Sequence, residues 1–149
     1  MKTLVTTNIY TDVTAPTDKN GALGVMAGLL AKDHHLNEKN LLAGFEQREA
    51  ESSTGFGNGV AIPHAKIDGL TDPFVGVVTF TQPVTWQSLD AAPVTIAIAL
   101  VMPADDPDQL HLKVLSKLAR KLMDDDFIAA LHKNQHDAQA LADVLNEVL

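Results

Sequence analysis

One histidine in this sequence ends a segment that can hold it firmly. His64 follows a glycine-rich turn (Gly55–Gly59), a short apolar strand (Val60–Ile62) and Pro63. The glycines permit positive φ angles and the close approach of another group. Pro63 fixes its own φ and favours an extended Ile62, which predicts that the strand ends there. We therefore expect His64 at the rim of a sheet, on a backbone of restricted conformation. A catalytic imidazole is useful at such a position.

A second histidine and an arginine have the types and positions to share a site with His64. His111 occupies the apolar stripe of a predicted helix near its amino end, three residues ahead of Val114. Arg48 flanks the apolar face of another predicted helix, just before the glycine-rich turn. Two imidazoles and a guanidinium suit an anion, most obviously a phosphoryl group. A neutral imidazole accepts a phosphoryl group well when hydrogen bonding holds its other nitrogen.

Structural explanations of the same residues stay open at this level. The glycine run is neither a G-x-G-x-x-G fingerprint nor a Walker loop, so by itself it indicates a flexible turn. A lone histidine after a proline is more often structural than functional. His111 could be a core histidine bonded to a backbone carbonyl, and Arg48 could be a solvated charge. Chemistry is therefore indicated only by the three residues together.

The other histidines and the aspartates do not form a recognisable metal site. His132 and His136 have a four-residue spacing but fall in a predicted turn, and His34 and His35 would point apart on a helix. The aspartates of segment 105–108 lack the glycine and closing glutamate of a calcium loop. The chain has no cysteine, which excludes disulfides, thiolate nucleophiles and cysteine-based metal sites. We expect no metal and no other cofactor.

Helices and buried strands must position these residues. Helices are predicted over residues 22–35, from the cap Asn37 to Arg48, from the cap Asp106 through Pro107 to Leu122, just after Asp126, and at the C-terminus. Phe74–Phe80 and Val94–Val101 read as interior strands, and an edge strand is expected within Leu4–Val13. Large and small residues alternate along Val94–Val101, which indicates that helices approach one face closely. These features predict α/β layers.

Length, composition and charge narrow the classes of function. At 149 residues the chain is most simply one domain, residues 1–149, with a substantial core. Eleven Lys and Arg against nineteen Asp and Glu give a net charge of −8, which disfavours nucleic acid and anionic membrane surfaces as partners. Neither a signal peptide nor an apolar stretch of membrane-spanning length is present, so we expect a cytoplasmic protein without membrane insertion.

The stretch from Arg48 to Ala65 reads R-E-x-x-x-S-T-G-F-G-N-G-V-A-I-P-H-A. It resembles the active-site signature of the IIA component of the bacterial phosphoenolpyruvate-dependent sugar phosphotransferase system, fructose–mannitol class. The resemblance extends over nearly the whole chain and includes the H-L-x-x-L-x-x-L-A run that starts at His111. It implies an α/β fold with a mixed β-sheet of about four to five strands sandwiched between helices in three layers.

The resemblance also implies roles for the three residues. His64 would be the phosphorylated residue, accepting phosphate through Nε2 from the phosphohistidine of the carrier protein HPr. His111 would donate a hydrogen bond to the phosphoryl oxygens or orient His64, and Arg48 would neutralise phosphoryl charge. Phosphate would then pass to a cysteine of a IIB protein or domain and reach a sugar through the membrane component IIC. Because this chain has no cysteine, the IIB acceptor is expected on another chain or subunit.

Four further residues can be compared with the positions of the family. Glu49 and Thr54 fall on positions of the family signature, and we assign them helix-end and turn roles before chemistry. Ala65 stands where many members of the family have glycine, and Ala91 follows Asp90 where glycine is frequent. Neither departure puts phosphoryl transfer in doubt.

Three functions are compatible with these features. The leading hypothesis is a phosphotransferase intermediate in the uptake and phosphorylation of a sugar. The alternative is a regulatory module of the nitrogen-related branch, which keeps the same histidine but acts by binding partners according to its phosphorylation state. The third is an anion-binding domain without turnover. The sequence does not separate the first two.

Overall fold

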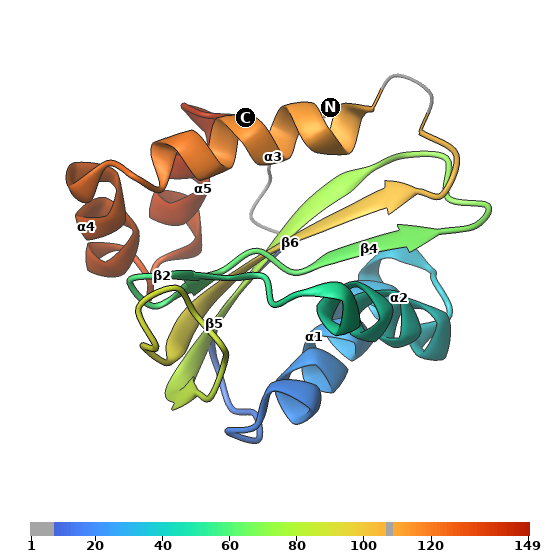
Figure 1. The fold of residues 1–149 in the computed structure, drawn as a ribbon, viewed down its shortest axis with the longest axis horizontal. Coiled ribbons are helices and arrows are strands. Elements are labelled where there is room, and N and C mark those ends of the chain that lie inside the picture. Colours follow the sequence, from blue (N-terminus) through green and yellow to red (C-terminus); the bar gives the residue numbers. More distant parts are fainter. Residues whose placement is uncertain (1–7, 107–108) are drawn as a thin grey trace.

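The computed structural model describes residues 8–106 and 109–149 (Figure 1). The elements in chain order are β1 (Ile9–Val13), α1 (Lys19–His34), α2 (Glu38–Glu51), β2 (Gly55–Gly57), β3 (Val60–Ala61), β4 (His64–Ile67), β5 (Phe74–Val84), β6 (Val94–Pro103), α3 (Leu110–Lys121), α4 (Asp125–Lys133) and α5 (Ala138–Asn146). Figure 1 shows α1 and α2 on one side of the sheet and α3, α4 and α5 on the other. The expected three-layer α/β arrangement is confirmed.

The described strands form one mixed, six-stranded sheet. Their order is β1-β5-β6-β3-β2, and β4 also pairs with β6. β5 and β6 are antiparallel, whereas β1 runs parallel to β5, and both β3 and β4 run parallel to β6. The mixed sheet is as expected, and the strand predicted at Val60–Ile62 is present as β3. The two added strands are β2, which pairs antiparallel with β3, and β4, which pairs with β6.

Strand β6 separates two apolar cores because its side chains alternate between the two faces. Its small residues Ala97 and Ala99 belong to the core shared with α1 and α2, as do Val94 and Val101. The core shared with α3, α4 and α5 contains Ile96, Ile98, Leu100 and Met102. A Cβ added to Gly76, which pairs with Ala99, would lie 2.4 Å from a methyl carbon of Leu30 in α1. The predicted close approach of helices to one face is therefore confirmed.

The chain near Pro63 differs from the prediction that the strand ends at this proline. β3 stops at Ala61, but His64 begins β4 at once and pairs with Leu100 of the same neighbour, β6. The Leu100 N–H donates to the Pro63 carbonyl at 2.9 Å. Proline has no N–H to pair, so it interrupts the strand while its carbonyl keeps the chain against β6. His64 is consequently the first residue of a strand and not a residue beyond the end of one.

Two predicted helix caps and the edge strand can be compared with the structure. Asn37 caps α2, since its side chain accepts a hydrogen bond from the Asn40 N–H at 3.0 Å. The prediction that Asp106 is the cap of the next helix is wrong in position: α3 begins at Leu110 with Gln109 in the cap position, and Asp106 accepts the Leu110 N–H at 3.0 Å from outside it. Pro107 lies outside the described residues. The edge strand is present as β1, and residues 4–7 of the prediction lie outside the described part.

The glycine-rich turn is fixed by contacts from two sides. Asn58 and Gly59 join β2 to β3 with φ angles of 56° and 79°. The Asn58 N–H donates to the Asp90 carboxylate at 2.9 Å, and its carbonyl accepts a hydrogen bond from Nε2 of His132 at 2.5 Å. A Cβ added to Gly59 would lie 2.9 Å from Cε1 of His132. The positive φ angles and the close approach expected of this turn are thus confirmed.

Ala91 leads to a prediction about stability. It follows Asp90 with a φ of 60°, a region in which a non-glycine residue is destabilised by about 1–2 kcal/mol. We expect Ala91→Gly to raise the free energy of unfolding by about 1 kcal/mol, because the relief of strain exceeds the added flexibility of glycine. Urea unfolding would measure the change. Ala92→Gly is the matched control and should lower stability; an equal gain in both variants would contradict strain at Ala91.

Candidate functional site

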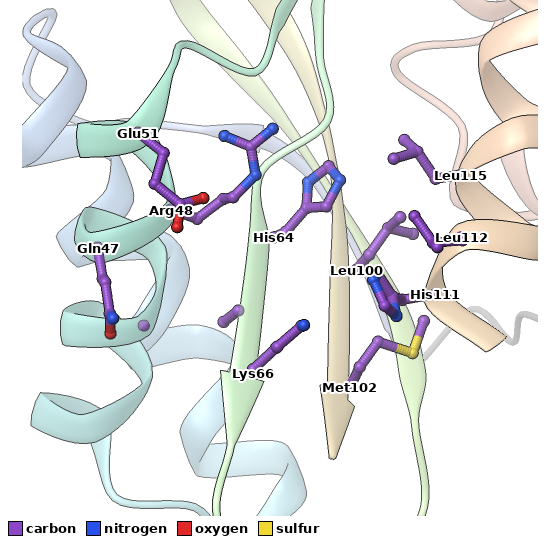
Figure 2. A pocket seen from close by; sticks show the side chains of 12 residues that line it. Gln47, Arg48, Glu51, His64, Lys66, Leu100, Met102, His111, Leu112 and Leu115 are labelled. Atoms are coloured by element: carbon purple, nitrogen blue, oxygen red, sulfur yellow. The ribbon is translucent and has the colours of Figure 1, made fainter. Parts of the chain in front are cut away.

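The three residues singled out in the sequence line one cavity of about 320 Å³ (Figure 2). Arg48 reaches it from α2, His64 from β4 and His111 from the first turn of α3. Figure 2 shows the Arg48 guanidinium beside the His64 ring, with His111 on the α3 side of the cavity. Residues separated by up to 63 positions, from 48 to 111, are therefore brought to one place by the sheet and its covering helices.

The alternation of β4 decides where His64 points. The side chains of His64 and Lys66 extend into the cavity, whereas Ala65, which borders it, and Ile67 pack into the core shared with α1 and α2. Ala65 is 1% exposed, and a Cβ added to Gly44 of α2 would lie 3.0 Å from the Ala65 Cβ. The alanine that stands in place of a frequent glycine therefore fits because its neighbour on α2 is itself glycine.

His64 is held neutral by its surroundings. Its pKa falls from 6.5 to about 4, chiefly because burial disfavours the charged ring and next because the Arg48 guanidinium repels it. The positive form of His111 acts in the same direction, while the Ile62 carbonyl and the Glu49 carboxylate oppose the change. The Ile62 carbonyl lies near enough to favour the protonated ring, but among the described residues no contact of either His64 ring nitrogen has the geometry of a hydrogen bond. A neutral imidazole with an unengaged lone pair is a competent nucleophile.

The lowered pKa of His64 predicts how acid affects the fold. Between pH 6.5 and about 4 the unfolded chain binds a proton at His64 that the folded protein excludes. Stability linked to His64 is therefore lost as the pH falls through this window, by at most on the order of 3 kcal/mol. Urea unfolding at both ends of the window should show this loss in the wild type and its absence in His64→Gln. An NMR titration that found an ordinary pKa for His64 would contradict the prediction.

Arg48 is tied to the end of its own helix. Its Nη1 donates to the Ser52 carbonyl at 2.7 Å and lies 3.4 Å from the Ser52 hydroxyl. A guanidinium has five N–H donors in a planar fork, so this contact leaves other donors for an anion at His64. The predicted position of Arg48 beside the apolar face, near the end of α2, is confirmed.

Glu49 and Thr54 have the structural roles expected of them. The Glu49 side chain is 4% exposed and accepts hydrogen bonds from the N–H and the hydroxyl of Thr54. Its carboxylate also pairs with the Lys19 ammonium at 3.4 Å. Because α1, the end of α2 and the start of the glycine-rich segment meet at this carboxylate, Glu49 fixes the chain that leads to His64.

His111 has a partner that sequence analysis treated only as a helix cap. Nδ1 of His111 lies 2.5 Å from Oδ2 of Asp106. The pKa of Asp106 is lowered to about 2, first by this hydrogen bond and then by the backbone N–H of His111. The Asp106 carboxylate therefore stays ionised and accepts the Nδ1 proton. Nε2 is then the nitrogen of His111 that is available to a ligand in the cavity.

Two functional candidates were missed in the sequence. Lys66 lies two residues after His64 on the same strand face, and the period of two in a strand was a signal that could have identified it. The contact of Asp106 with the His111 ring had no such signal, because it crosses a loop and follows no regular period. The remaining histidines have structural contacts: His132 bonds the Asn58 carbonyl, and His34 stacks on Phe74 with ring centroids 3.6 Å apart.

Two absences can be stated for residues 8–106 and 109–149. No group of three or more His, Cys, Asp or Glu side chains there is arranged to hold a metal ion. None of the helices in this part of the chain has the length and apolar character needed to cross a membrane.

The fold is a three-layer α/β arrangement with a mixed sheet, and its site places a neutral histidine in a cationic cavity. Proteins of this class are suited to handling an anion at an imidazole. Sequence comparison identifies the family. Residues 4–148 match the family described as "Phosphoenolpyruvate-dependent sugar phosphotransferase system, EIIA 2", and the chain belongs to this family. The resemblance found in the signature from Arg48 to Ala65 is thus confirmed.

Relatives within the family carry two kinds of name. The nitrogen regulatory protein of Klebsiella oxytoca is 35% identical over 130 residues, which cover 87% of this chain and 79% of the relative. The fructose-specific EIIA component of Haloferax volcanii is 30% identical over 135 residues, which cover 90% of this chain and 86% of the relative. These two kinds of name correspond to the two leading hypotheses from the sequence. The comparisons therefore identify the family but do not decide between the two roles.

Solved structures share the fold over almost the full chain. The nitrogen regulatory protein IIA-Ntr of Neisseria meningitidis superimposes with a TM-score of 0.83 at 26% identity, covering 96% of each chain. The complex of enzyme IIAMTL with phosphorylated enzyme IIBMTL of Escherichia coli contains a chain with a TM-score of 0.73 at 18% identity, covering 97% of each. The second likeness shows the fold alone.

Proposed function

We propose that this protein is a histidine phosphoryl carrier in which His64 accepts and then releases a phosphoryl group. The observation that supports this proposal best is the buried His64 ring, whose nitrogens have no hydrogen-bond partner among the described residues. A buried polar group without a partner is destabilising in a finished core, but it suits a nucleophile whose partner is the incoming substrate. The low pKa of the ring keeps the lone pair available near neutral pH.

The transfer step needs no cofactor. The Nε2 lone pair of His64 attacks the phosphorus of a donor phosphohistidine, and a new P–N bond forms as the donor's P–N bond breaks. The electrons of the broken bond remain on the donor's ring nitrogen. Phosphoryl transfer of this kind requires mainly alignment and neutralisation of the equatorial oxygens. The cavity supplies both, because His64 is fixed by β4 and cationic groups surround it.

The charged residues of the cavity match the charge of the proposed intermediate. Phosphohistidine carries a dianionic phosphoryl group, which Arg48 can neutralise through its planar fork. His111 lies on the α3 side, and Lys66 adds a second permanent cation from β4, while the Glu51 carboxylate also lines the cavity. The two permanent cations outnumber this carboxylate, so the site is locally cationic in a protein of net charge −8. Such a field favours the phosphorylated state of His64 over the phosphate in solution.

The donor and acceptor are proposed from the family. We assign an HPr-type phosphohistidine carrier as donor and a IIB protein or domain on another chain as acceptor. The structural neighbour that is a complex of enzyme IIAMTL with phosphorylated enzyme IIBMTL supports an acceptor of this kind. In the sugar-uptake role the phosphoryl group would continue from IIB to a sugar through IIC.

The regulatory role is the second candidate, and the comparisons give it specific support. The IIA-Ntr structure superimposes with a TM-score of 0.83 at 26% identity, which supports the regulatory role, whereas sequence identity does not separate the two roles: a nitrogen regulatory protein is 35% identical to this chain and a fructose-like EIIA component is 34% identical. In this role the phosphorylated and unphosphorylated forms of His64 would bind partners differently. The same carrier chemistry serves both roles, so the phosphoryl acceptor decides between them.

Phosphoryl acceptance can be tested with intact protein. We expect incubation with phosphoenolpyruvate, enzyme I and HPr to add one acid-labile phosphoryl group, detected by mass spectrometry. Absence of the added mass with an active HPr would contradict an HPr-type donor and leave the anion-binding alternative. The phosphorylated protein, once isolated, is then mixed with a IIB protein. Rapid transfer favours sugar uptake, whereas a stable phosphoryl group with altered partner binding favours regulation.

A further inference from the structure

One carboxylate makes three contacts at the start of α3. Oδ1 of Asp106 accepts the Leu110 N–H at 3.0 Å, and Oδ2 accepts the His111 N–H at 3.1 Å. Oδ2 also lies 2.5 Å from Nδ1 of the His111 ring. The side chains of Asp106 and His111 are 10% and 18% exposed. The ring and the first turn of the helix are therefore held by the same mostly buried group.

Three other aspartates cap helices: Asp124 of α4 also pairs with the Lys121 ammonium at 3.7 Å, whereas the remaining two show what a cap alone does. Asp18 of α1 accepts the Gly21 N–H at 2.8 Å, and Asp137 of α5 accepts the Ala140 N–H at 3.1 Å. No contact with a side chain is described for either cap. Capping explains the bonds of Asp106 to the α3 backbone, but it does not explain the bond to the His111 ring.

We propose that Asp106 is a positioning residue of the phosphoryl site, which fixes the His111 ring with a proton on Nδ1 and Nε2 turned to the cavity. This inference rests on the proposed function of His64. An ionised carboxylate can only accept, so the nitrogen that faces it must carry the proton. The aspartate of a serine-protease triad fixes a histidine in the same physical way.

The arrangement limits what His111 can do. In the neutral ring, Nε2 has a lone pair and can only accept a hydrogen bond. In the protonated ring, Nε2–H can donate to a phosphoryl oxygen while Asp106 keeps Nδ1–H and balances the charge. The other charged and titratable groups lining the cavity are Arg48, Glu51, His64 and Lys66. Contact with a phosphoryl oxygen therefore requires the protonated ring, whereas the neutral ring can accept a hydrogen bond and so orient His64.

The tautomer of His111 can be measured without any phosphoryl donor. Nitrogen-15 NMR of the wild-type protein at alkaline pH should place the proton of neutral His111 on Nδ1. In Asp106→Ala the proton should move to Nε2, the position that free imidazole side chains favour. Asp137→Ala, the matched cap variant, should leave His111 unchanged. A wild-type His111 with its proton on Nε2 would overturn the proposal whether or not the variants fold.

Transfer kinetics test whether Asp106 acts through His111. We expect Asp106→Ala to slow phosphoryl transfer to or from His64 by about 10- to 100-fold, since a hydrogen bond to a charged group is lost. In a His111→Ala background the same change should have no further effect, as a double-mutant cycle would show. Asp137→Ala should match the loss of stability but keep wild-type rates. Independent, multiplying effects of Asp106 and His111 would contradict the positioning role.

The two experiments separate this inference from the proposed function. If His64 is never phosphorylated, the proposed function fails, but the Nδ1 tautomer of His111 is still observed. If His64 is phosphorylated and the tautomer is Nε2–H, only the role of Asp106 fails. Asp106→Asn, which keeps an acceptor for the helix N–H groups, provides the rate measurement if Asp106→Ala does not fold.

Discussion

His64→Ala will abolish phosphoryl acceptance while the fold persists. The substitution removes the proposed nucleophile. Arg48 and Lys66 are charged, and the His111 ring, although its Nε2 is free, is held by Asp106 on the α3 side of the cavity and not at the position that β4 gives to His64. Loss of the covalent acceptor should therefore eliminate labelling instead of slowing it. Intact-mass spectrometry after incubation with phosphoenolpyruvate, enzyme I and HPr measures the result, and circular dichroism checks the fold.

A second histidine variant serves as the control for His64→Ala. His136 pairs with Asp12 at the surface, is not among the cavity residues, and has a side chain that is 66% exposed. His136→Ala should be labelled as fully as the wild type. Retained labelling of His64→Ala would show that another residue accepts the phosphoryl group and would remove the basis of the proposed function.

Arg48→Ala will slow phosphoryl acceptance on His64 by roughly 10- to 100-fold, the effect of losing a charge-assisted hydrogen bond to the phosphoryl oxygens. Arg48→Lys should fall between this variant and the wild type, because it restores the charge without the bidentate fork. The variants also lose the contact with the Ser52 carbonyl at the end of α2. Rates of mass gain under limiting HPr measure the effect.

The pKa of His64 provides an independent readout for Arg48. The guanidinium is the second largest cause of the lowered pKa, after burial. Arg48→Ala should therefore raise the pKa of His64 toward its ordinary value, whereas Arg48→Lys should leave most of the effect. Lys39→Ala, which removes an exposed cation from the same helix, is the matched control and should change neither rate nor pKa. Wild-type kinetics in Arg48→Ala would rule out a direct phosphoryl contact.

Much of the fold could be predicted because it follows from local patterns. The alternation of small and large residues in β6 indicated two faces with different packing, and Ala97 and Ala99 lie in one core and Ile96, Ile98 and Leu100 in the other, although Val94 lies with the alanines. Asn37 predicted the start of α2 correctly, because a capping side chain bonds to a backbone N–H within three residues. The start of α3 was placed too early, since the chain reaches Leu110 through a left-handed Gln109 that no cap signal predicts.

The sequence by itself determined which residues carry the proposed chemistry. The signature from Arg48 to His64 is contiguous, and its glycines and proline have consequences that depend only on their own backbone. His111 was identifiable because it lies on the inward face of an amphipathic helix. These features depend only on a few neighbouring residues, so they can be recognised without knowledge of the rest of the chain.

Only the tertiary structure decided how those residues act. His64 lies in the cavity because β4 returns to β6 after Pro63, a pairing between positions 64 and 100 that no local pattern specifies. Its pKa near 4 arises from burial by elements distant in sequence. The contact of Asp106 with the His111 ring joins residues five positions apart, a spacing that belongs to no regular period. Burial and long-range pairing are properties of the whole packed chain. The sequence therefore identified the residues but did not show their protonation states or partners.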